Sequence, residues 1–373
     1  MSTQTHPSLN VSMDLEESMY EAAGLRINIL PSSLPCLKQQ HNSTMRVHKN
    51  PPFRMSEKNT FTQRYTISHV LGEGGFGKVY AGTRNQDSLP VAIKVIGNFR
   101  MNPASKRPPL EVRLLHKLSH IKGVIRLIDA CYSGGSLIIV MERVENAMDL
   151  LAFAEKHTLT PELTRSLFRQ LVETVIECHS AGVVHRDIKP ENILIDVRTN
   201  TIKLIDFGCA CYFKEFQSNL KGTPEYQPPE LFRDGRCRNV SSTIWSLGVT
   251  LYVLCADRFP YDDIWELEKL DAEDITFPEG VPMQCQDLIR SILKFDPNER
   301  PSLEEVLLHP YLRTQSSVST GCSSPVTQQH DSYIPAAWNS SLDVEQTMLS
   351  LEDIVQRYVL SDSWSYAACT PCA

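Results

Sequence analysis

Long apolar runs are missing from this chain of 373 residues. No segment reaches the roughly 18 consecutive apolar residues of a membrane-spanning helix, and the longest apolar stretch, from Trp245 to Ala256, is expected to form a buried helix. The residues from Met1 to Asn10 are polar, so we expect no signal peptide. We therefore expect no membrane partner.

Positive charge is also in short supply. The chain has 37 Lys and Arg residues against 44 Asp and Glu residues, which leaves a net charge of −7. This balance argues against a general surface for nucleic acid or anionic membranes, so we expect no nucleic acid partner. A mildly acidic protein favours basic peptides instead, although charge alone is a weak guide.

Cysteines at metal-ligand spacing are scarce, although the chain has 11 cysteines. Neither close pair, Cys209 with Cys211 or Cys369 with Cys372, has a second pair that would complete a zinc site of about four ligands. Reduced thiols and a cytoplasmic location, with the nucleus as a second one, fit this usage best. A metal or redox role for the terminal pair stays open as the less favoured alternative.

Composition divides the chain into three parts. Residues 1–62 are rich in Ser, Thr, Asn, Gln and Pro and are expected to be a flexible leader. Residues 63–313 carry the apolar periodicity of a folded domain. Residues 314–373 return to a polar composition and are expected to be mostly flexible, with one amphipathic helix over 342–359. This helix either folds back on its own domain, which we favour, or binds a partner.

The folded part is predicted to be α+β and bilobal. The small N-lobe, 63–143, is rich in strands and contains one helix, which begins near Leu110. The larger C-lobe, 144–313, is mostly helical, with Thr160 as the cap of one helix, Ser241 or Ser242 as the cap of the apolar helix, and a capping box at Ser302 and Glu305. The strands of the N-lobe are expected at Tyr65 to Leu71, Val79 to Ala81, Leu89 to Val95, Val124 to Ile128 and Leu137 to Met141.

Chemically active side chains concentrate in the loop from His185 to Asn192. Asp187 can accept a proton, Asn192 can hold a metal, and Lys189 can contact a phosphate. Asp206, in Asp-Phe-Gly, offers a second metal-binding group. These groups are the ones that phosphoryl transfer requires.

A glycine-rich turn lies upstream, between Leu71 and Val79. Its G-x-G-x-x-G pattern alone is weak, because dinucleotide-binding folds also use it. Those folds pass from strand to helix, whereas Val79-Tyr80-Ala81 reads as a second strand. We therefore predict a hairpin that lies over phosphates, with Phe76 at its tip.

Lys94 ends an otherwise apolar strand, and a buried ammonium needs a partner. Glu111 is the single acidic residue between Val95 and Ile128, so an ion pair of Lys94 with Glu111 is predicted. This pair would steady Lys94 against the α- and β-phosphates. The alternatives are a purely structural ion pair or a surface lysine.

Five motifs, in this order, resemble the eukaryotic protein kinases over Tyr65 to Leu312. They are the glycine-rich turn, Val91-Ala-Ile-Lys94, His185-Arg-Asp187 with Asn192, Asp206-Phe-Gly208, and Pro228-Pro-Glu230. Finer stretches resemble the Pim group of serine/threonine kinases, for example Gly123-Val-Ile-Arg-Leu-Ile-Asp129 and Ile244-Trp-Ser-Leu-Gly248. The resemblance implies a monomer that uses ATP and Mg²⁺ to phosphorylate serine or threonine in proteins. A binding scaffold of the pseudokinase type is the alternative, and the presence of Lys94, Asp187 and Asp206 argues against it.

The resemblance also implies residue roles. Asp187 would take the proton of the substrate hydroxyl, Asn192 and Asp206 would hold Mg²⁺, and Lys189 would neutralise charge on the moving phosphoryl group. Glu230 and Arg300 would form a buried ion pair. The ATP contacts it implies are Leu71, Gly72, Glu73, Gly74, Gly75, Phe76, Gly77, Lys78, Val79, Ala92, Lys94, Met141, Glu142, Val144 and Leu194.

Two positions depart from the family pattern. Most protein kinases have an Asp where Thr243 stands, and that Asp braces the catalytic loop; Pim kinases also lack it. Val144 replaces the hinge proline of Pim kinases. Valine has an N–H, so we predict two backbone hydrogen bonds to adenine, from Glu142 C=O and Val144 N–H.

Substrate choice and control follow from the same resemblance. Glu191 and Asp149 occupy positions at which related kinases bind arginines upstream of the acceptor, and Thr223 is typical of serine/threonine kinases. We therefore predict basic substrates. Asp262 and Asp263 either add to this acidic field or are solvated surface groups.

Activity without activation-loop phosphorylation is also predicted. Arg186 would then need a standing partner, and Glu215 is the candidate, although Ser218 and Tyr212 are phosphoacceptors in the same segment. Cys209 either lines the ATP pocket or, as we favour, is a small packing residue.

Overall fold

The computed structural model describes Met55 and residues 61–74, 77–99, 107–218, 221–262 and 272–313. All of them belong to one compact unit, Asn50–Ala373. Most of the predicted leader, the predicted helix over 342–359 and the rest of the C-terminal tail lie outside the described residues, as do Gly75, Phe76 and Asp263.

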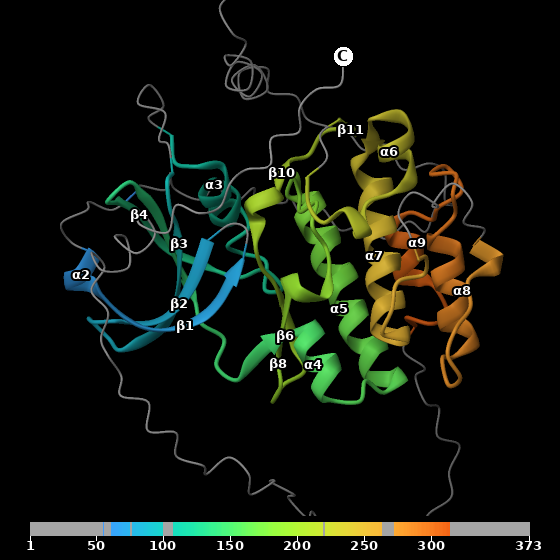
Figure 1. The fold of residues 1–373 in the computed structure, drawn as a ribbon, viewed down its shortest axis with the longest axis horizontal. Coiled ribbons are helices and arrows are strands. Elements are labelled where there is room, and N and C mark those ends of the chain that lie inside the picture. The colour runs from blue at the N-terminus through green and yellow to red at the C-terminus, as the bar shows by residue number, and fades with distance from the viewer. Residues whose placement is uncertain are drawn as a thin grey trace, which may run out of the picture. The chain divides into compact units, whose positions relative to one another are not determined.

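The N-lobe is an antiparallel sheet of five strands in the order β1-β2-β3-β5-β4 (Figure 1). One helix, α3 (Leu110–Lys117), packs beside it, and a short helix, α2 (Phe61–Arg64), precedes it. The strands are β1 (Tyr65–Gly74), β2 (Gly77–Arg84), β3 (Leu89–Ile96), β4 (Leu127–Ser133) and β5 (Ser136–Glu142).

The predicted strand from Val124 to Ile128 is misplaced. Strand β4 begins at Leu127, and Val124 instead forms an isolated parallel bridge to Leu204 of the C-lobe. The apolar residues that suggested a strand are buried because this segment crosses to the other lobe. Local pattern alone cannot separate these two reasons for burial.

Alternation along β3 decides which side chains face the C-lobe. Successive side chains of a strand point to opposite faces. Val91, Ile93 and Val95 are fully buried in a cluster on one face of the sheet. Ala92 and Lys94 therefore point to the other face. The alternation of side chains along β3 therefore points Lys94 towards the interior between the lobes.

The C-lobe consists of helices around one long buried helix, α7 (Asn239–Ala256). Helix α7 is long and apolar enough to cross a membrane, but 78% of its apolar window is buried within the protein, as in a core helix. Trp245 and Tyr252 are among the largest fully buried side chains. The predicted buried helix at Trp245 to Ala256 is thus confirmed. The other α-helices in the described part of the C-lobe are α4 (Leu150–Lys156), α5 (Pro161–Ser180), α6 (Pro229–Asp234), α8 (Met283–Ile292) and α9 (Leu303–Leu308).

Helix ends follow the predicted chemistry in two cases out of three. The Thr160 side chain accepts from Leu163 N, and Ser302 with Glu305 forms the full capping box. The third prediction is wrong, because α7 begins at Asn239, before Ser241 and Ser242. Those hydroxyls contact distant segments instead: Ser241 Oγ donates to Pro297 O, and Ser242 Oγ accepts from Gln217.

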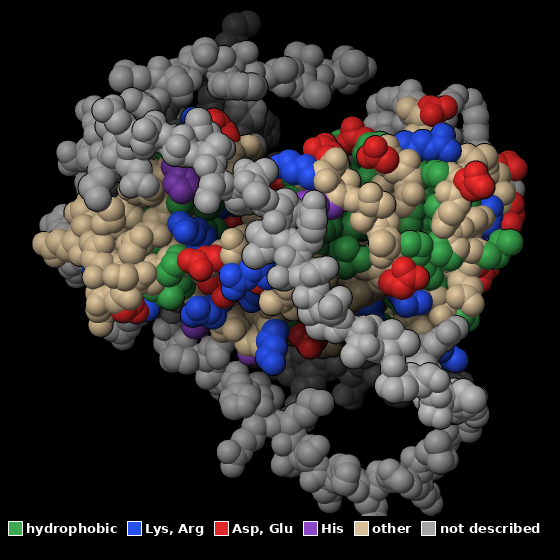
Figure 2. All heavy atoms as spheres, turned by 90° about the horizontal axis from the view of Figure 1, so that it is seen from below, with side chains coloured by type: hydrophobic (Ala, Val, Ile, Leu, Met, Phe, Trp, Pro, Cys, Tyr) green, Lys and Arg blue, Asp and Glu red, His purple; other side chains and the backbone are tan. Residues whose placement is uncertain are grey.

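Short strands complete the C-lobe and carry the loops between them. Strand β8 lies between β6 and β9, and β7 pairs with β10. The face shown in Figure 2 carries basic and acidic side chains side by side. The short strands are β6 (Ala147–Asp149), β7 (Val183–Val184), β8 (Ile193–Asp196), β9 (Thr201–Leu204), β10 (Cys211–Tyr212), β11 (Phe216–Gln217) and β12 (Cys237–Arg238).

Candidate active site

The loop between β7 and β8 holds Asp187 in a buried position, with 5% of the residue exposed. Its Oδ1 accepts from both N and Oγ1 of Thr223, each at 2.8 Å. Its Oδ2 accepts from Asn192 Nδ2 at 2.9 Å. Both carboxylate oxygens are therefore held by donors, which fixes the orientation of the group.

Lys189 joins the same cluster. Its Nζ donates to Thr223 Oγ1 at 2.6 Å and lies 3.7 Å from Asp187 Oδ2. The structure thus brings together Asp187, Lys189, Asn192 and Thr223, which the sequence predicted as site residues. Thr223 was predicted as a substrate residue, and here it links the activation segment directly to the Asp187 carboxylate.

Lys94 reaches two carboxylates from β3. Its Nζ lies 2.8 Å from Glu111 Oε1 on α3 and 2.8 Å from Asp206 Oδ1. The predicted pair with Glu111 is confirmed, whereas the contact with Asp206 was missed. Burial lowers the pKa of the Lys94 ammonium, but the two carboxylates raise it more, so its net shift is upward. The lysine is therefore charged at neutral pH.

Asp206 and Asn192 offer oxygen ligands of the kind that Mg²⁺ prefers. Asp206 uses Oδ1 for Lys94 and for Gly208 N, and among the described residues Oδ2 has no hydrogen-bond partner. Burial raises the pKa of Asp206, but Lys94 lowers it more, so this carboxylate stays ionised. No group of three or more His, Cys, Asp or Glu side chains at metal-binding spacing occurs within the described ranges. One carboxylate and one amide fit a magnesium ion that takes its other ligands from phosphates and water.

The glycine-rich turn is a hairpin, as predicted. Residues at the end of β1 pair with those at the start of β2, so strand follows strand: Gly72 with Val79, Glu73 with Lys78, and Gly74 with Gly77. Gly77 has φ +125°, and a Cβ there would lie 2.3 Å from Val95 O. Only glycine, which has no Cβ, allows the backbone at position 77 to lie this close to β3.

The connection between the lobes starts at the end of β5. Ala92 is paired with Met141, and Leu194 of β8 lies opposite Asp149, so these residues occupy the strands on either side of the connection. The Glu142 side chain accepts hydrogen bonds from Lys203 Nζ at 2.7 Å and from Arg126 N at 2.9 Å. The adenine contacts of Glu142 C=O and Val144 N–H stay predictions.

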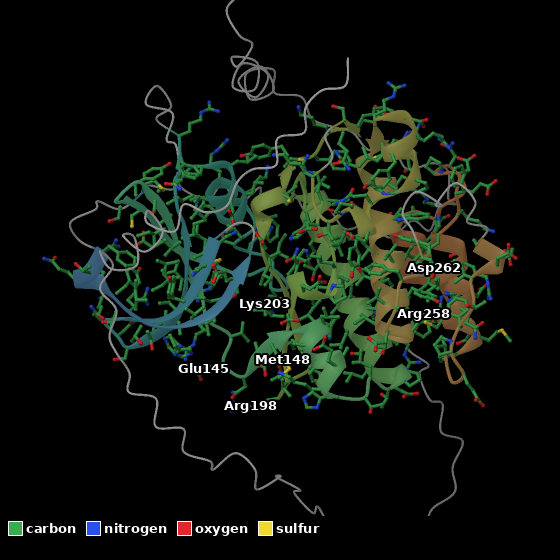
Figure 3. The ribbon with its side chains drawn as sticks, viewed as in Figure 1. Glu145, Met148, Arg198, Lys203, Arg258 and Asp262 are labelled. Atoms are coloured by element: carbon green, nitrogen blue, oxygen red, sulfur yellow. The ribbon has the colours of Figure 1, made fainter. Side chains whose placement is uncertain are left out.

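A polar cavity of about 390 Å³ adjoins the same connection. Figure 3 shows two of its residues, Glu145 and Arg198, together with Lys203 at the junction with the C-lobe. Apart from Glu142, it contains none of the predicted site residues. Its lining is Leu89, Pro90, Arg126, Glu142, Arg143, Glu145, Asn146, Asp196 and Arg198.

Comparison with known proteins decides the family. The family described as "Protein kinase domain" matches residues 65–312, well over half of the chain. This chain is a protein kinase.

The kinase is similar to serine/threonine kinases from three organisms. It is 38% identical over 281 residues to pim-2 of Danio rerio, covering 71% of this chain and 89% of the relative. It is 37% identical to prk-2 of Caenorhabditis elegans over 69% of this chain and 60% of the relative. It is 33% identical to the probable kinase MARK-A of Dictyostelium discoideum over 68% of this chain and 24% of the relative.

The kinase anchors its activation segment through a buried ion pair, as predicted. Arg300 Nη1 donates to Glu230 Oε1 and Nη2 donates to Glu230 Oε2, both at 2.8 Å. Arg186, in contrast, does not form the predicted pair with Glu215. Its Nε donates to Cys209 O at 2.7 Å, while Glu215 is exposed and its carbonyl accepts from Asn239 N. The strand pairing of β11 with β12 carries Glu215 away from the loop.

His185 of the kinase is held by backbone rather than by residue 243. Its Nε2 donates to Ile205 O at 2.8 Å, and its ring meets the Phe207 ring edge-on at 4.7 Å. Burial lowers the pKa of His185, so the ring is neutral and its Nδ1 accepts from Asp187 N. The Thr243 hydroxyl donates to Asn239 O at 2.8 Å.

The predicted substrate residues Glu191 and Asp149 differ in the hydrogen-bond partners of their carboxylates. Asp149 Oδ1 accepts from Ala152 N and caps helix α4, which gives it a structural role. Glu191 Oε2 is buried and has no hydrogen-bond partner among the described residues. Asp262, which Figure 3 labels in the C-lobe, is exposed. Cys209 is buried, and burial raises the pKa of its thiol, as expected of a packing residue.

Besides the contact of Lys94 with Asp206, the sequence did not predict two further contacts at this site. Lys203 lies on β9 and pairs with Glu142, and Gln227 contacts the catalytic loop. Gln227 stands directly before the Pro228-Pro229-Glu230 motif. Neither residue belongs to a motif that signals its partner, because both contacts join segments more than 40 residues apart.

Proposed function

We propose that this serine/threonine protein kinase transfers the γ-phosphoryl group of Mg-ATP to basic substrates that carry arginine upstream of the acceptor. We also propose that it is active without activation-loop phosphorylation. The observation that carries the first proposal is the buried, unpartnered Oε2 of Glu191. A buried carboxylate oxygen without a donor is unfavourable, and an arginine guanidinium supplies paired donors in a matching geometry.

The phosphoryl-transfer roles follow from the geometry around Asp187. Asp187 accepts the proton of the substrate hydroxyl, and the donors from Thr223 and Asn192 hold its carboxylate in place. Lys189, beside it, neutralises negative charge on the phosphoryl group. Mg²⁺ held by Asn192 and Asp206 would supply further positive charge at the same group. Lys94 would hold the α- and β-phosphates.

Independence from activation-loop phosphorylation rests on contacts that need no phosphate. Thr223 already reaches Asp187, and Arg186 is already engaged with Cys209 O. We expect a phosphatase-treated Ser218→Ala variant to keep at least half of the wild-type kcat. A loss of tenfold or more would overturn this part of the proposal.

A transfer assay with radioactive ATP tests the catalytic roles. Wild type should label a basic protein substrate, and Asp187→Ala should lower the rate by at least a hundredfold. Equal label in both would indicate a binding scaffold with a contaminating activity.

Paired peptides test the role of Glu191. For a peptide with arginine upstream of the acceptor, Glu191→Gln should lower kcat/KM by about ten- to a hundredfold, since one charge-assisted hydrogen bond contributes roughly 1.5–3 kcal/mol. A peptide with alanine in those positions should be used equally by both enzymes. Glu304→Gln, which removes an exposed carboxylate in the first turn of α9, is the control. Wild type that does not distinguish the two peptides would refute arginine specificity.

A further inference from the structure

Arg186 of the catalytic loop has an unfavourable backbone conformation. Its φ is +68°, in the left-handed region that residues other than glycine rarely adopt. Such a conformation persists only where the surroundings hold it. Thr243 does not do so, because its hydroxyl donates to Asn239 O and otherwise lies 3.4 Å from His179 Nε2. Another group must therefore fix the peptide that precedes Asp187.

Gln227 is placed to do this. It is 1% exposed, and its Nε2 donates to Arg186 O at 3.2 Å and to Lys221 O at 3.1 Å. An amide nitrogen has two hydrogens, and each has one carbonyl here. The reversed amide would place its oxygen against both carbonyls, so the orientation is set by the partners. We propose that Gln227 is the positioning residue of the catalytic loop, clamping the Arg186 peptide to the activation segment.

The clamp acts on a very close backbone contact. Gly222 lies where the activation segment meets the catalytic loop. Its φ is +92°, and a Cβ on it would lie 2.3 Å from Arg186 O. The next residue, Thr223, supplies both donors to Asp187 Oδ1. Loss of the Gln227 amide would therefore let the loop and the segment separate and would loosen the Asp187 carboxylate. This inference rests on the proposed role of Asp187 as the proton acceptor.

Gln217 provides a matched control, because it is a buried glutamine whose partners lie outside the catalytic loop. Gln217 belongs to the same activation segment, is 8% exposed and also donates through Nε2, to Cys237 Sγ at 3.1 Å and Ser242 Oγ at 3.3 Å. Neither of its partners belongs to the catalytic loop. Gln227→Met and Gln217→Met remove the same group and keep a side chain of similar length, so only the loop contact distinguishes them.

The test measures kcat, the KM for ATP and Tm on the full chain. We expect Gln227→Met to lower kcat by about ten- to thirtyfold, the range expected for two lost hydrogen bonds, with KM for ATP unchanged within about twofold. Both variants should lower Tm by similar amounts. Gln217→Met, however, should keep kcat within about twofold of wild type. Equal loss of kcat in both variants, or none in Gln227→Met, would overturn the inference.

A rescue by a second brace provides an independent readout. Thr243→Asp restores the residue that most protein kinases carry there, and in the Gln227→Met background it should recover at least a third of the lost kcat. A folded double variant without recovery would show that Gln227 does not act on the loop. Wild type and Asp187→Ala are measured alongside, so an inactive wild type would refute the proposed function rather than the role of Gln227.

Discussion

The buried ion pair of Arg300 with Glu230 provides the sharpest stability prediction. The Arg300 side chain is 0% exposed and that of Glu230 is 4% exposed. Besides the two bonds to Glu230, the guanidinium donates to the carbonyls of Ser241, Lys294 and Phe295 and lies 4.8 Å from the Trp245 ring centre. It therefore joins α6, which follows the activation segment, to α7 and to the chain after α8.

Arg300→Met would leave the Glu230 carboxylate buried without a partner. Removing one member of a buried pair lowers the free energy of unfolding by roughly 3–5 kcal/mol, because the remaining charge cannot regain its hydration. For a domain of this size, each kcal/mol shifts Tm by about 2–4 °C, so we expect a loss of roughly 6–20 °C. Glu230→Met together with Arg300→Met strands no charge and should be less destabilised than either single variant.

Urea unfolding and thermal scans of the full chain measure these changes. The control is Asp234→Asn on the same helix, where the pair of Arg233 with Asp234 is about 40% exposed and screened by water, so no measurable change is expected. Single-variant losses below about 1 kcal/mol would refute the reasoning. So would a double variant whose loss equals the sum of the two single losses, since the pair would then be uncoupled.

Three further predictions address pH, ATP binding and the backbone. Burial lowers the pKa of His179 from 6.5 to about 4, so below pH 6.5 the unfolded chain binds a proton that the folded chain does not. The free energy of unfolding should therefore fall by about 2 kcal/mol between pH 6.5 and 5. In urea unfolding, His179→Gln should reduce this dependence on pH. Val144→Pro should raise the KM for ATP about five- to tenfold by removing one N–H donor, and an unchanged KM would exclude that donor. Gly222→Ala should lower kcat by at least about tenfold through the clash with Arg186 O, whereas Gly280→Ala, also at positive φ but with nothing within 4 Å of its Cβ, should keep kcat.

Local sequence patterns predicted the parts of the fold that depend on neighbours along the chain. The alternation of β3, the cap at Thr160 and the capping box at Ser302 each involve residues within a few positions of one another. The two wrong boundaries, at Val124 and at Ser241, share a cause. In both places backbone or hydroxyl groups bond to segments far along the chain, and these bonds decide where the element starts.

The sequence by itself identified the groups that we propose carry the chemistry: Asp187, Lys189, Asn192 and Asp206 stand at fixed spacings. It also showed that Glu111 is the single acidic residue between Val95 and Ile128. Only the tertiary structure decided that Lys94 also reaches Asp206, that Arg186 turns to Cys209 O rather than Glu215, and that Gln227 holds the loop. The physical reason is distance along the chain. Spacing fixes what one turn or strand presents, whereas the partner of a buried donor is set by packing between segments that no local pattern relates.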